Sequence, residues 1–154
     1  MSDNDKDYDK AKAVELLNSI LEFELAGVVR YTHYSLMIFG HSRIPIIDWM
    51  SAQATESLMH AKQAGEHVTT LGGHPSLKIG KLLESEQHSI NEILTESLEH
   101  ERGGLKLYYE LLECTEEKSV WLEEYSRAMI EAEEAHIAEV EKMIRKPGDL
   151  SPAR

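Results

Sequence analysis

The segment EAEEAH, residues 131–136, places Glu133 and His136 three positions apart. In a helix, residues with this spacing lie on one face, so a carboxylate and an imidazole would point the same way. Both side chains are metal ligands, and the pair could therefore be half of a metal site. The simpler interpretation is a solvated acidic face. The metal interpretation requires the rest of the chain to supply the other ligands.

Two further glutamates interrupt apolar stripes. Apolar residues recur at spacings of three and four, and Glu24 and Glu101 each fall in the middle of such a stripe, as Glu133 does. A buried carboxylate is costly unless it is paired or bound to a metal, and three at one height would repel one another unless protonated or neutralised by cations. A hydrogen-bond network is the structural alternative. The pattern favours a metal site of oxygen and imidazole ligands, which suits iron, manganese or zinc.

The remaining stripe contains His60 as an inward-facing polar residue. The residue three positions earlier is Ser57 rather than a glutamate, and Glu56 lies on the other flank of His60, about 40° round the helix. Two hypotheses remain open here. Glu56 reaches the site through a long rotamer or a π-bulge, or it is solvated and one of two metal positions is weak.

Four helices must position these residues. Pro and Gly cluster at 40–45, at 72–80 and after 146, and CTEEKS at 114–119 also interrupts the apolar periodicity. We predict helices at roughly 8–39, 45–71, 83–113 and 119–145. Only the join between the second and third is long, which is typical of a bundle with a crossover. The predicted fold is all-α, a four-helix bundle in one domain, 1–154, with the bundle over about 8–145 and a short tail, 146–154.

Polar residues off the stripes are expected to be solvated. On the third helix these are Glu92, Glu96 and Glu99. The histidines expected at the surface or flanks of the bundle are His67, His74, His88 and His100. Trp49 and Trp121 begin helices and are expected to anchor the bundle ends.

The composition excludes several classes of protein. A formal net charge of −12 argues against nucleic acid as a partner, because phosphate binding needs clustered Lys and Arg. The single cysteine, Cys114, excludes an intramolecular disulfide and a thiolate cluster within one chain. The chain has no apolar signal region and no apolar run of about 18 residues. We therefore expect a cytoplasmic protein with no membrane partner.

Over about residues 12–145 the chain resembles the bacterioferritins and, more broadly, the ferritin-like di-iron proteins. The likeness lies in LLNSILEFELAGVVRYTHYSLM, ESLMHAKQAGEHVTTLGGHP and EAEEAH. In that family one glutamate from each of two helices and a Glu-x-x-His pair from each of the others hold two irons. The resemblance assigns the single glutamates to Glu24 and Glu101, one pair to Glu133 with His136, and the other histidine to His60. It also makes Tyr31 the tyrosine near the metals. Placing Glu101 requires a one-residue shift in the crossover, with Glu99 or His100 as alternatives.

Two positions depart from the family pattern. Ser57 stands where the family has a glutamate that bridges the irons, and Leu58 stands where bacterioferritins have a haem-ligating methionine, so we expect no haem. The tail is also a poor match to the family's short fifth helix.

The resemblance implies iron binding, oxidation of Fe(II) by oxygen or peroxide at a di-iron site inside the bundle, and iron storage in a homo-oligomeric cage or a mixed cage. The chain would then be a ferroxidase if the site is functional. Two alternatives stay open. The first is a degenerate subunit with a weak or single-metal site and a structural or binding role, and the second is a di-iron oxidoreductase that stores no iron.

Overall fold

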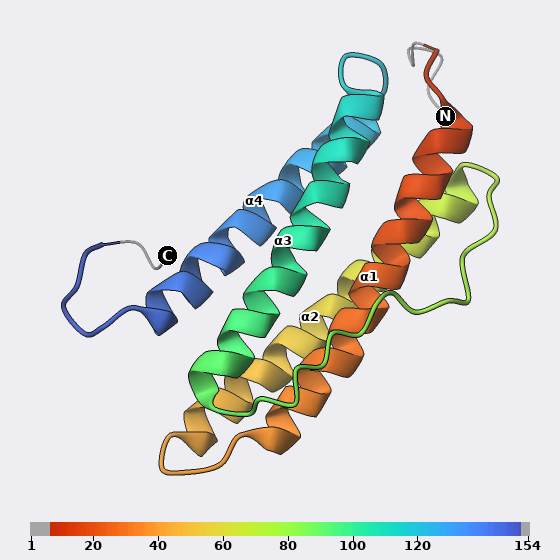
Figure 1. Ribbon diagram of the computed structural model, residues 1–154. Helices are drawn as coiled ribbons and strands as arrows, with labels where there is room; N and C mark the ends of the chain where they lie inside the picture. Colours follow the sequence, from red (N-terminus) through yellow and green to blue (C-terminus); the bar gives the residue numbers. More distant parts are fainter. Residues whose placement is uncertain (1–6, 152–154) are drawn as a thin grey trace.

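The computed structural model describes residues 7–151, which form a bundle of four helices with no strand in that range (Figure 1). The helices are α1 (Lys10–Met37), α2 (Arg43–Thr70), α3 (Ile90–Thr115) and α4 (Val120–Ile144). Short turns join α1 to α2 and α3 to α4, whereas residues 71–89 form a long connection between α2 and α3. The predicted all-α four-helix bundle with a long crossover is confirmed. Among the described residues, no helix combines the length and apolar character needed to cross a bilayer.

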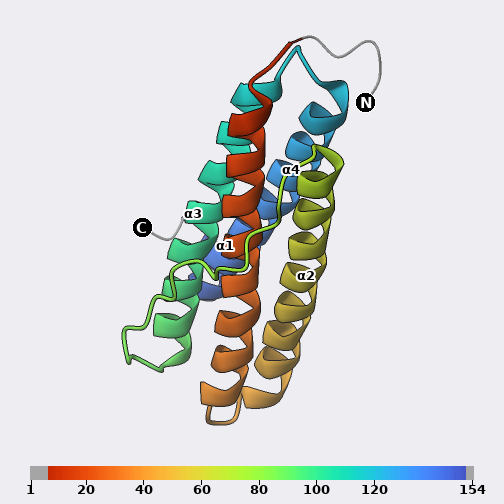
Figure 2. The same cartoon turned by 90° about the vertical axis from the view of Figure 1, so that its right-hand side faces the viewer.

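The crossover runs along α1, as Figure 2 shows. Asn18 of α1 holds its first part, since the Asn18 side chain donates to the His74 carbonyl and accepts from the Ser76 backbone N–H, at 3.1 and 2.8 Å. Further along, the Gly80 N–H donates to the Glu22 carbonyl at 2.8 Å. A Cβ atom at Gly80 would lie 2.9 Å from that same oxygen, so this close approach requires glycine.

Helix α3 begins at Ile90, seven positions after the predicted start at residue 83. Ser89 is its N-cap: the Ser89 hydroxyl accepts from the Glu92 N–H, and the Glu92 carboxylate accepts from the Ser89 N–H. Glu86 has a φ of 56°, a left-handed conformation that ends any regular helix before it. The helix-forming residues at 83–88 therefore belong to the crossover.

A layer of polar side chains divides the core at one height. One apolar cluster includes Leu17 and Ile20 of α1 with Leu111 and Leu122, and the other includes Ile38, Met50, Ile93 and Val140. Between these clusters lie buried polar residues from every helix: Glu24 of α1, Ser57 and His60 of α2, Glu101 of α3 and Glu133 of α4. The four helices are thus packed by apolar contacts above and below a shared polar layer.

Glu96 corrects one expectation, because it is not solvated. Its side chain is only 10% exposed and forms an ion pair with Arg30 at 3.3 Å. It also accepts hydrogen bonds from the Tyr34 hydroxyl and from the Ser85 backbone N–H. This charged side chain on the flank of α3 is half-buried because the crossover and α1 both contact it.

Candidate metal centre

Three buried side chains from three helices converge in the polar layer. Each of Glu24, His60 and Glu133 offers a ligand atom, and these three atoms lie within 4.8 Å of one another. His60 Nδ1 lies 3.5 Å from Glu24 Oε1. The same Glu24 oxygen accepts a hydrogen bond of 2.7 Å from the Tyr108 hydroxyl, which fixes the carboxylate from the α3 side. This group has the composition of one metal position, with two carboxylates and an imidazole.

Glu101 and His136 lie next to each other in the same layer and are joined by Tyr31. The Tyr31 hydroxyl donates to Glu101 Oε1 at 2.5 Å and lies 3.1 Å from His136 Nε2. His136 Nε2 is 3.7 Å from Glu101 Oε1. A carboxylate and an imidazole at this separation could close on one ion, since metal–ligand bonds to these atoms are about 2 Å long.

The orientation of His136 comes from a residue that the sequence did not point to. The indole of Trp49 stacks on the His136 ring, with centroids 5.5 Å apart and planes at 7°. Trp49 was expected only to anchor a bundle end. Nothing in the spacing of residues indicates this contact, because it depends on how α2 and α4 meet in space.

A small cavity separates the two groups. Its lining includes His60, Glu101, Glu133 and His136, together with Glu56 and Ser57 of α2. A free volume of about 10 Å³ corresponds to roughly one water molecule, which excludes an organic substrate from the centre. The space suits ions and small diatomic molecules.

The pKa of Glu133 is strongly shifted by its surroundings in the centre. Burial, followed by the neighbouring carboxylate of Glu101, raises the pKa of Glu133 well above its ordinary value. Burial also raises the pKa of Glu24. For Glu101 burial acts in the same direction, but the hydrogen bond with Glu133, the charge of His136 and the hydrogen bond from Tyr31 lower its pKa overall. The environment therefore favours the neutral form of Glu133 and the ionised form of Glu101.

The residues fit a cation. Glu133 Oε2 is buried and has no hydrogen-bond partner among the described residues. A buried oxygen without a partner is costly, and a metal ion between Glu133 and its neighbours would both satisfy it and neutralise the carboxylates. The donor set of carboxylates and imidazoles matches first-row transition metals.

Ser57 supplies no carboxylate to the centre. Its neighbour Glu56 does supply one, but only at the edge of the cavity. Ser57 is buried against α1, where a Cβ on Gly27 would lie 2.8 Å from the Ser57 hydroxyl. Glu56 is 48% exposed, yet its Oε1 lies 3.7 Å from His60 Nε2 and it lines the cavity. Because α2 is regular throughout this region, no π-bulge brings Glu56 inward, and only the rotamer route remains.

Of the three candidate ligands on α3, only Glu101 faces the centre. Glu101 lines the cavity, Glu99 is exposed, and His100 turns away to stack on Phe23 with centroids 4.2 Å apart. His100 was expected at the surface or a flank, and this was wrong. It is buried, and burial lowers its pKa to about 4.

Comparisons with known proteins identify the family of the chain. The family model described as Ferritin-like domain matches residues 14–147. A bacterioferritin from Desulfovibrio desulfuricans is 28% identical over 152 residues, covering 94% of this chain and 83% of its own length. The structure of Rhodobacter capsulatus bacterioferritin, which has a metal-free dinuclear site, is 27% identical with a TM-score of 0.78, covering 90% of this chain and 86% of that one.

A structure of lower identity shows the same fold. The dodecameric thioferritin from Bacteroides fragilis is 20% identical with a TM-score of 0.81, covering 88% of this chain and 85% of that one. Together with the buried ligand group of Glu24, His60 and Glu133, the family match and the bacterioferritin relative support iron binding and storage. The chain belongs to the ferritin-like family.

Proposed function

We propose that the chain oxidises Fe(II) at the centre inside the bundle and delivers Fe(III) for storage. The observation that carries the proposal is a cavity of about one water molecule lined by His60, Glu101, Glu133 and His136. The buried Glu24 joins this set through its ligand group with His60 and Glu133. Iron is here the substrate, and oxygen or peroxide takes its electrons. The protein contributes position and charge, while the metal contributes the redox chemistry.

The residues divide between two iron positions. Glu24 and His60 would hold one iron, Glu101 and His136 would hold the other, and Glu133 would bridge them, since it meets Glu24 in one group and neighbours Glu101 in the other. Because burial favours the neutral form of Glu133, Fe(II) binding would compete with a proton for its carboxylate. Tyr31 is a positioning residue that holds Glu101 and His136 together.

The two positions differ in strength under this proposal. The family's second bridging glutamate is replaced by Ser57, so each iron would lose one carboxylate ligand unless the Glu56 side chain turns inward from the rim. Tyr31 holds Glu101 and His136 together, which leaves the position next to His60 as the less rigidly formed of the two. We propose that the centre is asymmetric, with its weaker iron position next to His60. Manganese or zinc could bind the same ligands, and oxidation then distinguishes the functional metal.

A second candidate function follows from the same position. Because Ser57 supplies no carboxylate, the chain could instead be a binding or structural subunit of a cage that retains one metal without turnover. A di-iron oxidoreductase without storage is a third alternative, which differs in the absence of a mineral core.

Aerobic titration with Fe(II) tests these alternatives if bound iron per chain, the rate of Fe(III) formation and the particle mass are measured together. The proposal expects catalysed oxidation, about two irons per chain in the first phase and further loading into a large assembly. A Glu133→Ala variant is the matched control and should oxidise iron no faster than buffer. Oxidation by the wild type at the rate of this control would leave only the binding role. Catalysis without further loading would favour the oxidoreductase.

A further inference from the structure

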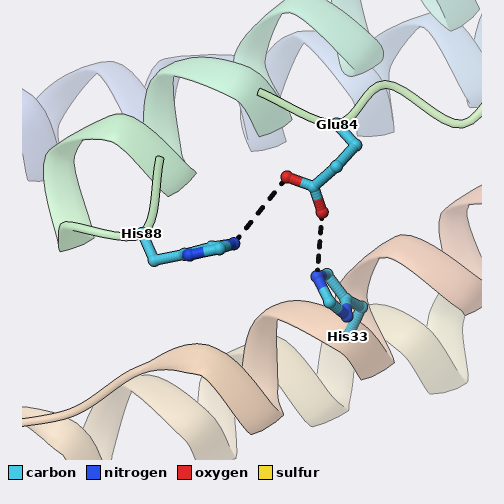
Figure 3. A group of neighbouring side chains, drawn as sticks. All are labelled: His33, Glu84 and His88. Carbon is cyan, nitrogen blue, oxygen red and sulfur yellow. Dashed lines mark hydrogen bonds and ion pairs between the residues drawn. The ribbon is translucent and has the colours of Figure 1, made fainter. Parts of the chain in front are cut away.

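We propose that His33, Glu84 and His88 form a second binding site, outside the bundle centre, for a divalent transition-metal ion such as Zn²⁺ or Fe²⁺. Figure 3 shows the three side chains converging from α1, from the crossover and from the residue before the N-cap of α3. Their potential ligand atoms lie within 4.8 Å of one another. The site is independent of the proposed iron oxidation and shares no residue with it.

The distances place Glu84 between the two imidazoles. His33 Nε2 lies 3.1 Å from Glu84 Oε2, and His88 Nε2 lies 3.7 Å from Glu84 Oε1. The two rings are 6.2 Å apart at their centroids and inclined at 69°. An ion bound at about 2.1 Å from each ligand atom needs only small side-chain rotations from this arrangement.

The His88 side chain provides a second, independent observation. Its Nε2 atom is buried and has no hydrogen-bond partner among the described residues, although the ring is partly exposed. A polar atom shielded from water normally finds a partner, and this one is aimed at the space beside Glu84. A metal ion at that point would bind the His88 nitrogen, the Glu84 carboxylate and His33 Nε2, which would exchange its contact with Glu84 for the metal.

The backbone that carries Glu84 is held in place by a buried network. Arg30 Nη1 donates to the Leu83 carbonyl at 2.8 Å, and the Ser85 N–H donates to Glu96 Oε1 at 2.8 Å. Both neighbours of Glu84 are therefore tied to the Arg30–Glu96 ion pair, in which the charge of Arg30 is compensated. Such support for the residues around a ligand reduces the ordering cost of metal binding.

His33 and His88 also stand on fixed backbone. His33 lies within α1, and His88 immediately precedes Ser89, the capped start of α3. The left-handed Glu86 turns the chain between Glu84 and His88 so that both side chains face His33. Glu84 Oε1 additionally accepts the Glu86 backbone N–H at 2.5 Å, which orients the carboxylate.

The ligand chemistry selects the ion. Two imidazoles and one carboxylate suit Zn²⁺, Fe²⁺ or Co²⁺, whereas Ca²⁺ and Mg²⁺ prefer sites built from oxygen. Three protein ligands leave the remaining positions to water. A bound ion would link His33 of α1 to Glu84 and His88 of the crossover and so hold the crossover against α1.

The test uses the full-length protein with Co²⁺, whose visible absorption reports imidazole ligation, and with Zn²⁺ in calorimetric titrations. Parallel titrations of Glu133→Ala remove the contribution of the bundle centre. We expect His88→Ala and Glu84→Gln each to lower the metal affinity of one class of site about tenfold or more. The loss should be the same in the wild-type and in the Glu133→Ala protein. His74→Ala, which removes another exposed histidine of the crossover, should leave every affinity unchanged.

A local readout completes the test. One equivalent of Zn²⁺ should slow amide hydrogen exchange in residues 83–89 of the Glu133→Ala protein and should not do so after the additional His88→Ala change. Unchanged helix content by circular dichroism checks that each variant is folded. The proposal would be overturned if His88→Ala left the Zn²⁺ and Co²⁺ affinities unchanged. It would also be overturned if Zn²⁺ did not change the exchange rates of residues 83–89.

Discussion

Tyr31 of α1 donates its hydroxyl to Glu101 of α3 over 2.5 Å, across the polar layer that divides the core. Burial, together with the charge of Glu101, raises the pKa of Tyr31 well above its ordinary value, so the hydroxyl remains a donor over the whole physiological range. The same hydroxyl lies 3.1 Å from His136 Nε2. One phenol thus sets the relative position of two proposed ligands of one iron.

Tyr31→Phe should therefore slow Fe(II) oxidation about tenfold while leaving the number of bound irons per chain unchanged. The ring still fills its place in the core, but the buried Glu101 carboxylate loses a donor, so the free energy of unfolding of the metal-free protein should fall by about 1–3 kcal/mol. Stopped-flow absorbance of Fe(III) formation measures the rate, and equilibrium dialysis measures the stoichiometry. A rate equal to that of the wild type would show that Tyr31 does not position the ligands.

Glu133 should make the stability of the metal-free protein depend on pH. Because burial and the Glu101 carboxylate raise its pKa, the folded state binds this proton more tightly than the unfolded state. The stabilisation is complete below the ordinary glutamate pKa and is lost as pH rises through the folded-state value. Glu24, whose pKa is also raised, contributes with the same sign.

Glu133→Gln keeps the shape of the side chain and removes its ionisation. The variant should be more stable than the wild type in mildly alkaline solution without metal, and it should gain less stability when Fe(II) or Co²⁺ is added anaerobically. Differential scanning calorimetry across the pH range checks both. If the variant instead loses stability at alkaline pH, Glu133 is held as an anion by contacts in the bundle.

Gly104 should not tolerate a larger side chain, whereas its neighbour should. A Cβ on Gly104 would lie 2.1 Å from the Phe23 ring, which itself stacks on His100, so Gly104→Ala should destabilise the protein by about 1–3 kcal/mol. A Cβ on Gly103 meets nothing within 4 Å among the described residues. Gly103→Ala in the same helix should be neutral or stabilising by up to about 1 kcal/mol. Urea unfolding of the two variants compares them directly.

The helices and the polar layer could be predicted because burial makes polar residues conspicuous. Glu24, Glu101 and Glu133 stand out in apolar stripes, and the spacing of a helix converts sequence position into height along the bundle. The start of α3 could not be predicted, since helix-forming residues at 83–88 are diverted by the left-handed Glu86 and by ties to α1.

Contacts that depend on the path of the crossover could not be predicted from the sequence either. Glu96 contacts Tyr34, and Glu84 contacts His33, although the residues of each pair are more than 50 positions apart. Glu84 and His88 meet within the irregular crossover. Helical periodicity carries no information about such a path. The Trp49–His136 stack is similar, because it follows from the packing of α2 against α4.

The role of Glu56 decides how strong the iron position next to His60 is. Its carboxylate reaches within 3.7 Å of His60 Nε2 but remains half exposed, and Ser57 fills the space against Gly27. On the asymmetric-centre view, Glu56→Ala should leave iron stoichiometry and oxidation rate unchanged, as should Glu99→Ala, an exposed glutamate of α3 used as the control. A loss of about tenfold or more in Glu56→Ala alone would make Glu56 a ligand. Ser57→Glu is the complementary change: it restores a carboxylate next to the cavity and should raise the oxidation rate. If Ser57→Glu folds and oxidises iron no faster than the wild type, a carboxylate at position 57 does not reach the iron positions.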